Sequence, residues 1–144
     1  MPALLQNAGG EDMKKKSVSK LKAEAWKLLS LIMRKKAGRC EACLSTDCLQ
    51  VHHLIPRARG NSVYFLRDNL IVLCRGCHYS LHNHWSPDEI KDLIDSVIGS
   101  ARWEEVEKLK HIYTKYSISD YEQMITDLKE ELKSLGDTDD NCVY

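Results

Sequence analysis

The sequence predicts an α+β fold in which two short strands and a short helix are flanked by an N-terminal basic helix and two to three C-terminal helices. Apolar residues recur at helical spacing over residues 17–37 and again after residue 86, which indicates amphipathic helices. Two short runs rich in β-forming residues, QVHHL at 50–54 and NLIVL at 69–73, are typical of short strands. The length of 144 residues suits one compact domain with a buried core.

The first predicted helix covers about residues 17–37 and is basic on its polar side. Lysines lie largely off an apolar stripe that consists of Val18, Leu21, Ala25, Leu28 and Ile32. Gly38 is expected to end this helix, because glycine readily adopts the left-handed conformation common at helix C-termini.

The middle of the chain alternates turns with short regular elements. CEACLSTDC at 40–48 reads as a turn, and PRARGNSVYFLRD at 56–68 as the loop between the two strands. CRGCHYSLHNHW at 74–85 follows the second strand, and its second half is expected to form a short helix.

The C-terminal part is predicted to be helical. SPDEIKDLIDSVIG begins with Ser86 as cap, Pro87 at the first helical position and Glu89 completing a capping box. ARWEEVEKLKHIY at 101–113 follows as a second helix. SDYEQMITDLKEELKSLG starts with another predicted capping box, Ser119 and Glu122. Its apolar stripe is expected to pack in the core on the first helix, or to support a homodimer.

The formal net charge is zero, yet the two halves of the chain differ strongly. Residues 13–60 carry 12 Lys and Arg against three acidic residues, a net +9, and residues 87–144 carry seven against 15, a net −8. A basic half indicates an anionic partner, and phosphate backbones are the commonest candidates. The alternative is two solvated helical faces of opposite sign.

Four of the six cysteines form two pairs, Cys40-x-x-Cys43 and Cys74-x-x-Cys77, separated by 30 residues. Two intervening residues let both sulfurs of a pair face one ion, and four thiolates complete the tetrahedron that structural zinc prefers. A chain of the reducing cytoplasm keeps its thiols free, which favours metal over a disulfide framework. The alternatives are unliganded buried cysteines or a redox dithiol.

Four histidines have the spacing that one site requires. His78 and His82 lie four residues apart, so on a helix their rings project from one face. His52 supplies a third ligand if its strand packs on that helix, whereas His53 points to the opposite side of the strand. An imidazole near neutral pH is suited to proton transfer, so we expect His52 to bind an ion and His53 to react. Taken singly, a histidine is more often a surface residue, or a core residue whose ring nitrogens are hydrogen-bonded, than a metal ligand.

VHHLIPRARG at 51–60, followed by LRDNLIVLCRGCHYSLH at 66–82, resembles the signature of HNH endonucleases. The members it resembles have a ββα-metal site and a structural zinc held by paired CxxC motifs. The resemblance covers residues 40–84, about a third of the chain. It implies a small ββα-metal core and a metal-dependent DNA endonuclease that leaves 5′-phosphate and 3′-hydroxyl ends.

The same resemblance implies a role for each motif residue. His53 takes the place of the general base that removes a proton from water, and Asn69 that of the side chain that bridges the loop and holds the base. One catalytic divalent cation is held by His52, His78 and His82. Three imidazoles favour Zn²⁺, Ni²⁺ or Co²⁺ by affinity, whereas Mg²⁺ or Mn²⁺ is what the cell supplies. Four arginines close to the motif are candidates for contacts with DNA phosphates: Arg57, Arg59, Arg67 and Arg75.

The flanks resemble the phage recombination nucleases called Rap or NinG, on the segments KSVSKLKAEAWKLLSLIMRKK, YFLRDNL, ARWEEVEKL and KYSISDYEQMITDLKEELKSL. This implies a phage-encoded protein that acts on branched DNA in the cytoplasm of a bacterial host. The first alternative to a nuclease is a non-catalytic, zinc-stabilised nucleic-acid-binding module. The second is a structural zinc protein whose C-terminal helices bind a protein partner.

We expect four segments along the chain. Residues 1–16 form a flexible leader, residues 17–86 the basic helix with the nuclease core, residues 87–136 a helical extension, and residues 137–144 a disordered acidic tail. No apolar run approaches the roughly 20 residues of a membrane span, so no contact with a membrane is expected.

Overall fold

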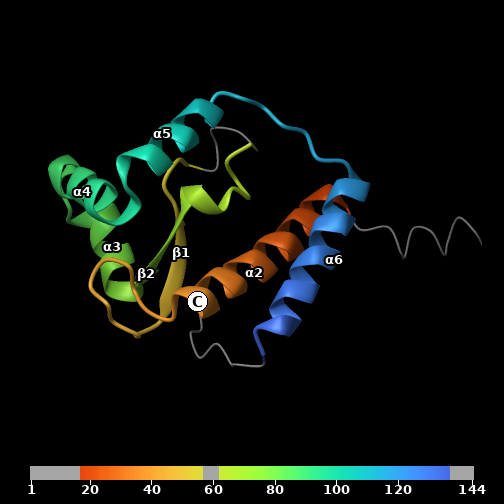
Figure 1. Ribbon diagram of the computed structural model, residues 1–144, viewed down its shortest axis with the longest axis horizontal. Coiled ribbons are helices and arrows are strands. Elements are labelled where there is room, and N and C mark those ends of the chain that lie inside the picture. Colours follow the sequence, from red (N-terminus) through yellow and green to blue (C-terminus); the bar gives the residue numbers. More distant parts are fainter. Residues whose placement is uncertain (1–16, 57–61, 137–144) are drawn as a thin grey trace, which may run out of the picture.

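The computed structural model describes residues 17–56 and 62–136. Over these residues the fold is α+β, as predicted, with a two-stranded antiparallel sheet and helices on both of its sides (Figure 1). The expected leader and acidic tail lie outside the described residues. Among the helices that the structure describes, none combines the length and the apolar character that crossing a bilayer requires.

The basic helix α2 spans Val18–Ala37, in agreement with the sequence prediction. Ser17 caps it by accepting a hydrogen bond from the backbone N–H of Lys20 at 3.3 Å. Gly38 ends it with φ of 70°, and its N–H donates to the carbonyl of Arg34 at 2.9 Å. One face of the helix is buried through Leu21, Ala25, Leu29 and Ile32.

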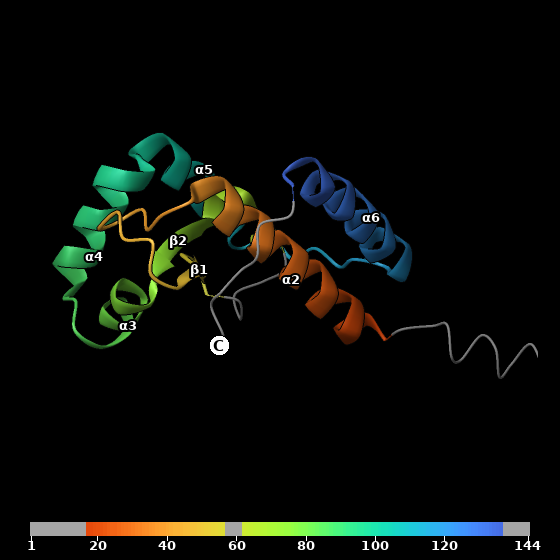
Figure 2. The same ribbon diagram turned by 90° about the horizontal axis from the view of Figure 1, so that it is seen from below.

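The sheet is a hairpin of β1 (Leu49–His53) and β2 (Leu70–Cys74). Every residue of β2 is buried. The two adjacent histidines lie on opposite faces of β1: the ring of His52 faces α3, and that of His53 faces α2. Figure 2 shows the hairpin between these two helices.

The connection between the strands ends in the 3₁₀ turn η2 (Arg67–Asn69). After β2 the chain enters α3 (Arg75–Asn83) at once, so the predicted short helix starts earlier than its sequence pattern indicates. The cause is Cys74, whose sulfur caps the helix by accepting a hydrogen bond from the N–H of Cys77 at 3.4 Å. A cysteine is not among the residues that commonly cap helices.

The next helix begins as predicted, whereas the one after it starts one residue before the predicted segment 101–113 and ends four residues before its end. Ser86 and Glu89 form the capping box of α4 (Pro87–Leu93), which continues as the π-helical turn η3 (Ile94–Ile98). Helix α5 (Ser100–Leu109) follows.

The cap of helix α6 (Ile118–Ser134) lies two residues before the predicted cap. Its capping box is Ser117 with Asp120, not Ser119 with Glu122, so that prediction was wrong. The sequence SISDYE contains both Ser-x-x-acid patterns, and the earlier one gives the helix an additional half turn.

Helices α2 and α6 lie side by side and run in the same direction (Figures 1 and 2). The apolar stripe of α6 packs on α2 within the chain, which is the first of the two alternatives raised by the sequence. Glu131, near the end of α6, forms ion pairs with Lys36 of α2 at 2.8 Å and with Arg67 of η2. These ion pairs connect the ends of the two helices to each other and to η2. Hydrogen bonds from Arg67 and then Lys36 lower the pKa of Glu131 to about 2. The shared core consists of Leu21, Ala25, Leu29, Ile32, Leu70, Tyr121, Ile125 and Leu128.

Helix α5 supports the end of the inter-strand connection through one arginine. Arg102 donates to the backbone carbonyls of Asp68 and Leu70, each at 2.9 Å. These carbonyls flank Asn69, so α5 fixes the backbone on both sides of that residue.

Candidate metal centres and active site

Four cysteines meet where the turn after α2 lies beside the start of α3. Cys40 and Cys43 come from the turn, Cys74 is the last residue of β2, and Cys77 lies in the first turn of α3. All four sulfurs lie within 4.8 Å of one another, and those of Cys43 and Cys74 are 3.6 Å apart. Two thiolates bound to one tetrahedral zinc ion lie about 3.8 Å apart, as Zn–S bonds of about 2.3 Å require. The cluster therefore has the dimensions of a zinc site.

Backbone N–H groups point at the sulfurs of this cysteine cluster. Those of Ala42 and Cys43 donate to the sulfur of Cys40 at 3.4 Å each. Burial raises the pKa of Cys40, but backbone N–H groups outweigh it and lower this pKa to about 7. The turn is attached to the sheet by Glu41, whose carboxylate accepts from the N–H of Val72 at 2.7 Å.

The thiol of Cys77 behaves differently from that of Cys40. The pKa of Cys77 is raised, first by burial and then by the neighbouring thiols of Cys43, Cys74 and Cys40. Four sulfurs this close cannot all ionise without a cation, because their negative charges would repel one another. A divalent ion supplies the compensating charge, so the chemistry of the donor set fits zinc.

The second cluster consists of His52, His78 and His82, whose ligand nitrogens lie within 4.8 Å of one another. The Nε2 atoms of His78 and His82 are 3.2 Å apart. Two nitrogens bound to one tetrahedral ion lie about 3.3 Å apart, given metal–nitrogen bonds of about 2.0–2.1 Å. The ring of His52 lies 5.3 Å and 4.9 Å from those of His78 and His82, measured between centroids. The three imidazoles thus have the arrangement of ligands to one ion.

The protonation of these histidines suits metal binding. Burial, together with the charges of His78, His82 and His53, lowers the pKa of His52 to about 4. Burial, with the charge of His82, also lowers the pKa of His78. At neutral pH both rings are therefore neutral, which is the form that binds a metal ion.

Gln50 lies on the same face of β1 as His52 and orients the ring of His78. Its side-chain oxygen accepts a hydrogen bond from Nδ1 of His78. That bond places the ring proton on Nδ1, so the lone pair of Nε2 faces the cluster. Our sequence reasoning missed Gln50, although the i, i+2 alternation with His52 on a strand would have placed it there.

Replacing Gln50 by leucine is expected to weaken divalent-ion binding at the three histidines by about 10–100-fold, since a lost second-shell hydrogen bond typically costs that much affinity. Calorimetric titration of Co²⁺ into zinc-loaded protein measures the effect. Gln123→Leu is the matched control, because Gln123 lies on α6 and bonds only to Asp127 among the contacts described. Equal affinities of the two variants would contradict the role given to Gln50.

His53 lies on the other face of β1 and is only 9% exposed. Its ring is stacked on Trp26 of α2, with centroids 4.5 Å apart and an interplanar angle of 26°. Its Nε2 lies 3.0 Å from the backbone carbonyl of Tyr64. A carbonyl only accepts hydrogen bonds, so Nε2 carries the proton and Nδ1 is the basic nitrogen of the neutral ring. Trp26 and Tyr64 were not singled out by the sequence reasoning.

Asn69 is fully buried beneath the inter-strand connection. Its side-chain oxygen accepts from the N–H of Ile55 at 2.8 Å, and its NH₂ group donates to the carbonyls of Val63 at 3.0 Å and Ile55 at 3.3 Å. The side chain therefore joins the two ends of the connection. Val63 directly precedes Tyr64, so Asn69 also fixes the backbone that binds His53.

Residues 40–84, which contain both clusters, His53 and Asn69, match the family model of the HNH endonucleases. This segment is of the HNH type. No curated protein and no solved structure matches the chain. The match confirms the resemblance drawn from the motifs of this segment, and the cysteine cluster fits the paired-CxxC zinc type. Trp26, which stacks on His53, lies outside the HNH segment.

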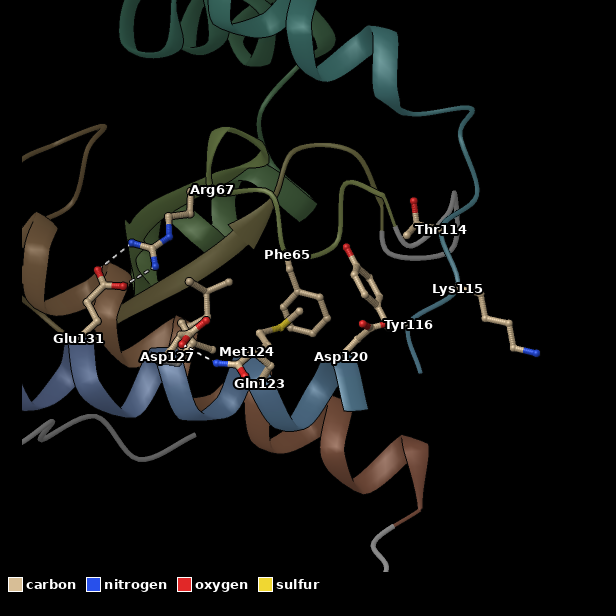
Figure 3. Close-up of a pocket in the computed structure, with 12 residues that line it drawn as sticks. Phe65, Arg67, Thr114, Lys115, Tyr116, Asp120, Gln123, Met124, Asp127 and Glu131 are labelled. Carbon is tan, nitrogen blue, oxygen red and sulfur yellow. Dashed lines mark hydrogen bonds and ion pairs between the residues drawn. The ribbon is translucent and has the colours of Figure 1, made fainter. Parts of the chain in front are cut away.

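The four candidate phosphate-binding arginines lie in different surroundings. Arg57 and Arg59 fall outside the described residues. Arg75 is exposed, and its guanidinium group lies 3.6 Å from the carboxylate of Asp47. Arg67 forms a two-pronged ion pair with Glu131 on α6 (Figure 3). Both residues line a pocket of about 560 Å³ between α6 and the segments around residues 65 and 115.

Proposed function

We propose that this protein is a metal-dependent endonuclease that hydrolyses phosphodiester bonds in DNA. A nuclease-type function that acts on DNA follows in general terms from the HNH segment. The observation that supports hydrolysis by this protein is the arrangement of four histidines, three of which converge while the fourth lies apart from them. His52, His78 and His82 converge as ligands, while His53 is bonded to Tyr64 and lies within electrostatic reach of His52.

His53 acts as the general base in this proposal. Its Nε2–H donates to the carbonyl of Tyr64, so the neutral ring takes up a proton at Nδ1. The water that attacks phosphorus gives its proton to this nitrogen, and the resulting imidazolium keeps its bond to the carbonyl. The bond between phosphorus and the 3′ oxygen breaks, and that oxygen leaves and takes up a proton from solvent. General-base catalysis of this kind typically contributes about 10²–10⁴-fold to a rate.

His52, His78 and His82 hold the catalytic divalent cation in the same proposal. The ion, when bound, supplies Lewis acidity to the oxygens of the phosphate. The low pKa of His52 keeps this ligand neutral, and Gln50 orients His78. Imidazole ligands suit Zn²⁺, Ni²⁺ and Co²⁺, while Mg²⁺ and Mn²⁺ remain the abundant alternatives. The four cysteines hold the structural zinc.

Asn69 is a positioning residue in this account. Its three hydrogen bonds to Ile55 and Val63 hold the connection whose next residue, Tyr64, bonds to His53. The base is thus oriented by a second layer of contacts, as catalytic groups generally require.

The substrate proposed is branched DNA, cut to leave 5′-phosphate and 3′-hydroxyl ends. This proposal rests on the resemblance of the flanks to the Rap or NinG recombination nucleases of phages, and on the basic helix α2. Exposed Arg75, together with Arg57 and Arg59, is proposed to contact phosphates. A cytoplasmic location is proposed because the four clustered cysteines fit a metal site rather than a disulfide framework.

The test is cleavage of a labelled four-way junction beside linear duplex and single strand of the same sequence. Each substrate is incubated with stripped, zinc-reconstituted protein and added Mg²⁺, Mn²⁺, Co²⁺ or Ni²⁺. Preferential cutting of the junction is the expected result. Equal cutting of all three substrates would keep the nuclease and remove the branched-DNA preference. Junction binding without cutting under any ion would instead support the non-catalytic binding module.

A further inference from the structure

The base proposed for catalysis is packed by a helix that lies outside the HNH segment. Trp26 lies on α2, and its indole is stacked nearly parallel to the ring of His53, with centroids 4.5 Å apart. Tyr64 contacts the same ring, at 4.8 Å between centroids, and meets Trp26 edge-on at 5.4 Å. The three rings form an aromatic cluster around His53.

The hydrogen bond to Tyr64 fixes one nitrogen of His53 but does not by itself fix the plane of the ring. Rotation of an imidazole about the bond that joins it to its side chain meets only broad energy minima. A flat surface against one face removes that freedom, because tilting the ring would break the stacked contact. Trp26 supplies this surface, and with the hydrogen bond it determines where Nδ1 points.

Trp26 is itself held firmly. Its neighbour Ala25 is fully buried, and Leu29, one turn later, belongs to the core shared by α2 and α6. One turn earlier, the ammonium group of Lys22 lies 4.2 Å from the centroid of the Tyr64 ring. Helix α2 therefore covers one side of the aromatic cluster, and the helix itself is packed in the core.

We infer that Trp26 is a positioning residue that holds the ring of His53 in the orientation needed for proton transfer. The inference rests on the proposed function, since it assigns Trp26 a part in the same site. It predicts a specific pattern: the chemical step slows when the indole is removed, whereas DNA affinity and ion binding at His52, His78 and His82 stay the same. A displacement of about 1 Å in a reacting group costs up to about 10²-fold in rate.

The variants that test this are Trp26→Leu, Trp26→Phe and, as the matched control, Trp103→Leu. Trp103 is a partly buried tryptophan on α5 that packs against apolar residues outside the core shared by α2 and α6, among them Leu93, Ile98 and Val106. We expect kcat to fall about 10–100-fold in Trp26→Leu with little change in KM, and to recover partly in Trp26→Phe because a smaller aromatic face remains. Trp103→Leu is expected to lose stability but keep its kcat.

A spectroscopic measurement tests the positioning without relying on activity. Nitrogen NMR of labelled histidine reports the tautomer of His53, and the shielding of its ring protons reports the stacked indole. Wild-type protein should show the Nε2–H tautomer and strongly shielded protons, and Trp26→Phe should show weaker shielding. If the wild type shows neither signature, or if folded Trp26→Phe and Trp26→Leu keep the wild-type kcat, the inference is overturned.

The same measurement separates this inference from the proposed function. If the wild type cuts no DNA but shows the shielded Nε2–H ring, the nuclease proposal fails and the positioning of His53 by Trp26 stands as a structural fact. If the wild type cuts DNA while the Trp26 variants are as active as the Trp103 control, the nuclease stands and the role of Trp26 is overturned.

Discussion

Replacing His53 by alanine is expected to reduce DNA cleavage about 10²–10⁴-fold, which removes measurable activity. The variant loses the imidazole next to His52 that lies outside the three-histidine cluster and is bonded to the carbonyl of Tyr64. Binding of DNA and of both ions should persist, because His53 belongs to neither cluster. Initial rates on the preferred substrate, together with gel-shift and metal titrations, measure these quantities.

His111→Ala is the matched control for this variant. His111 is exposed in the connection between α5 and α6, so its loss should leave cleavage unchanged. Circular dichroism verifies that both variants are folded, since removing the His53 ring also leaves a space beside Trp26. Cleavage by folded His53→Ala at the rate of His111→Ala would show that another group takes the proton.

Removing zinc from the cysteine cluster is expected to have the largest effect on stability. A structural zinc ion contributes on the order of 10 kcal/mol to the folded state of a small domain. Here it would join the turn after α2 to the start of α3, and so fix the end of the hairpin where Leu49 pairs with Cys74. Chelation, or the variant Cys40→Ser, should therefore unfold the hairpin and lower the melting temperature markedly.

The control for chelation is the same chelator presaturated with zinc, which should leave the melting temperature unchanged. Re-addition of zinc to the stripped wild type should restore folding, and re-addition to Cys40→Ser should not. Metal analysis of protein with an intact fold and no bound zinc would contradict this account of the cluster.

Much of the fold could be predicted because its signals are local in the sequence. Ser17 and Gly38 bound α2 as expected, and the Ser86–Glu89 capping box starts α4. The strict alternation of side chains along a strand predicted that His52 and His53 would face opposite ways, and they do. The spacing of the cysteines and histidines similarly led us to expect that each set would converge, and both sets do. Their role as metal ligands stays a prediction.

The parts that could not be predicted depend on contacts between residues far apart in the chain. In the sequence, Trp26 cannot be distinguished from the other apolar residues of α2. Only the packing of that helix on β1 brings Trp26 to His53. Arg67 was a candidate for a phosphate contact because of its position near the motif, whereas its carboxylate partner lies 64 residues later. The sequence also could not decide between Ser117 and Ser119 as the cap of α6, since each is followed three residues later by an acidic residue.

The central claim is that an ion bound by three histidines, with His53 as base, cleaves DNA. The most direct measurement is a titration of Co²⁺ into stripped, zinc-reconstituted wild-type protein, in which ion occupancy and DNA cleavage are followed in the same sample. We predict that cleavage rises in proportion to the occupancy of the His52, His78 and His82 site and is lost in His82→Ala at the same concentrations of ion. Full occupancy of this site without cleavage, or equal cleavage by His82→Ala with the site empty, would contradict the account.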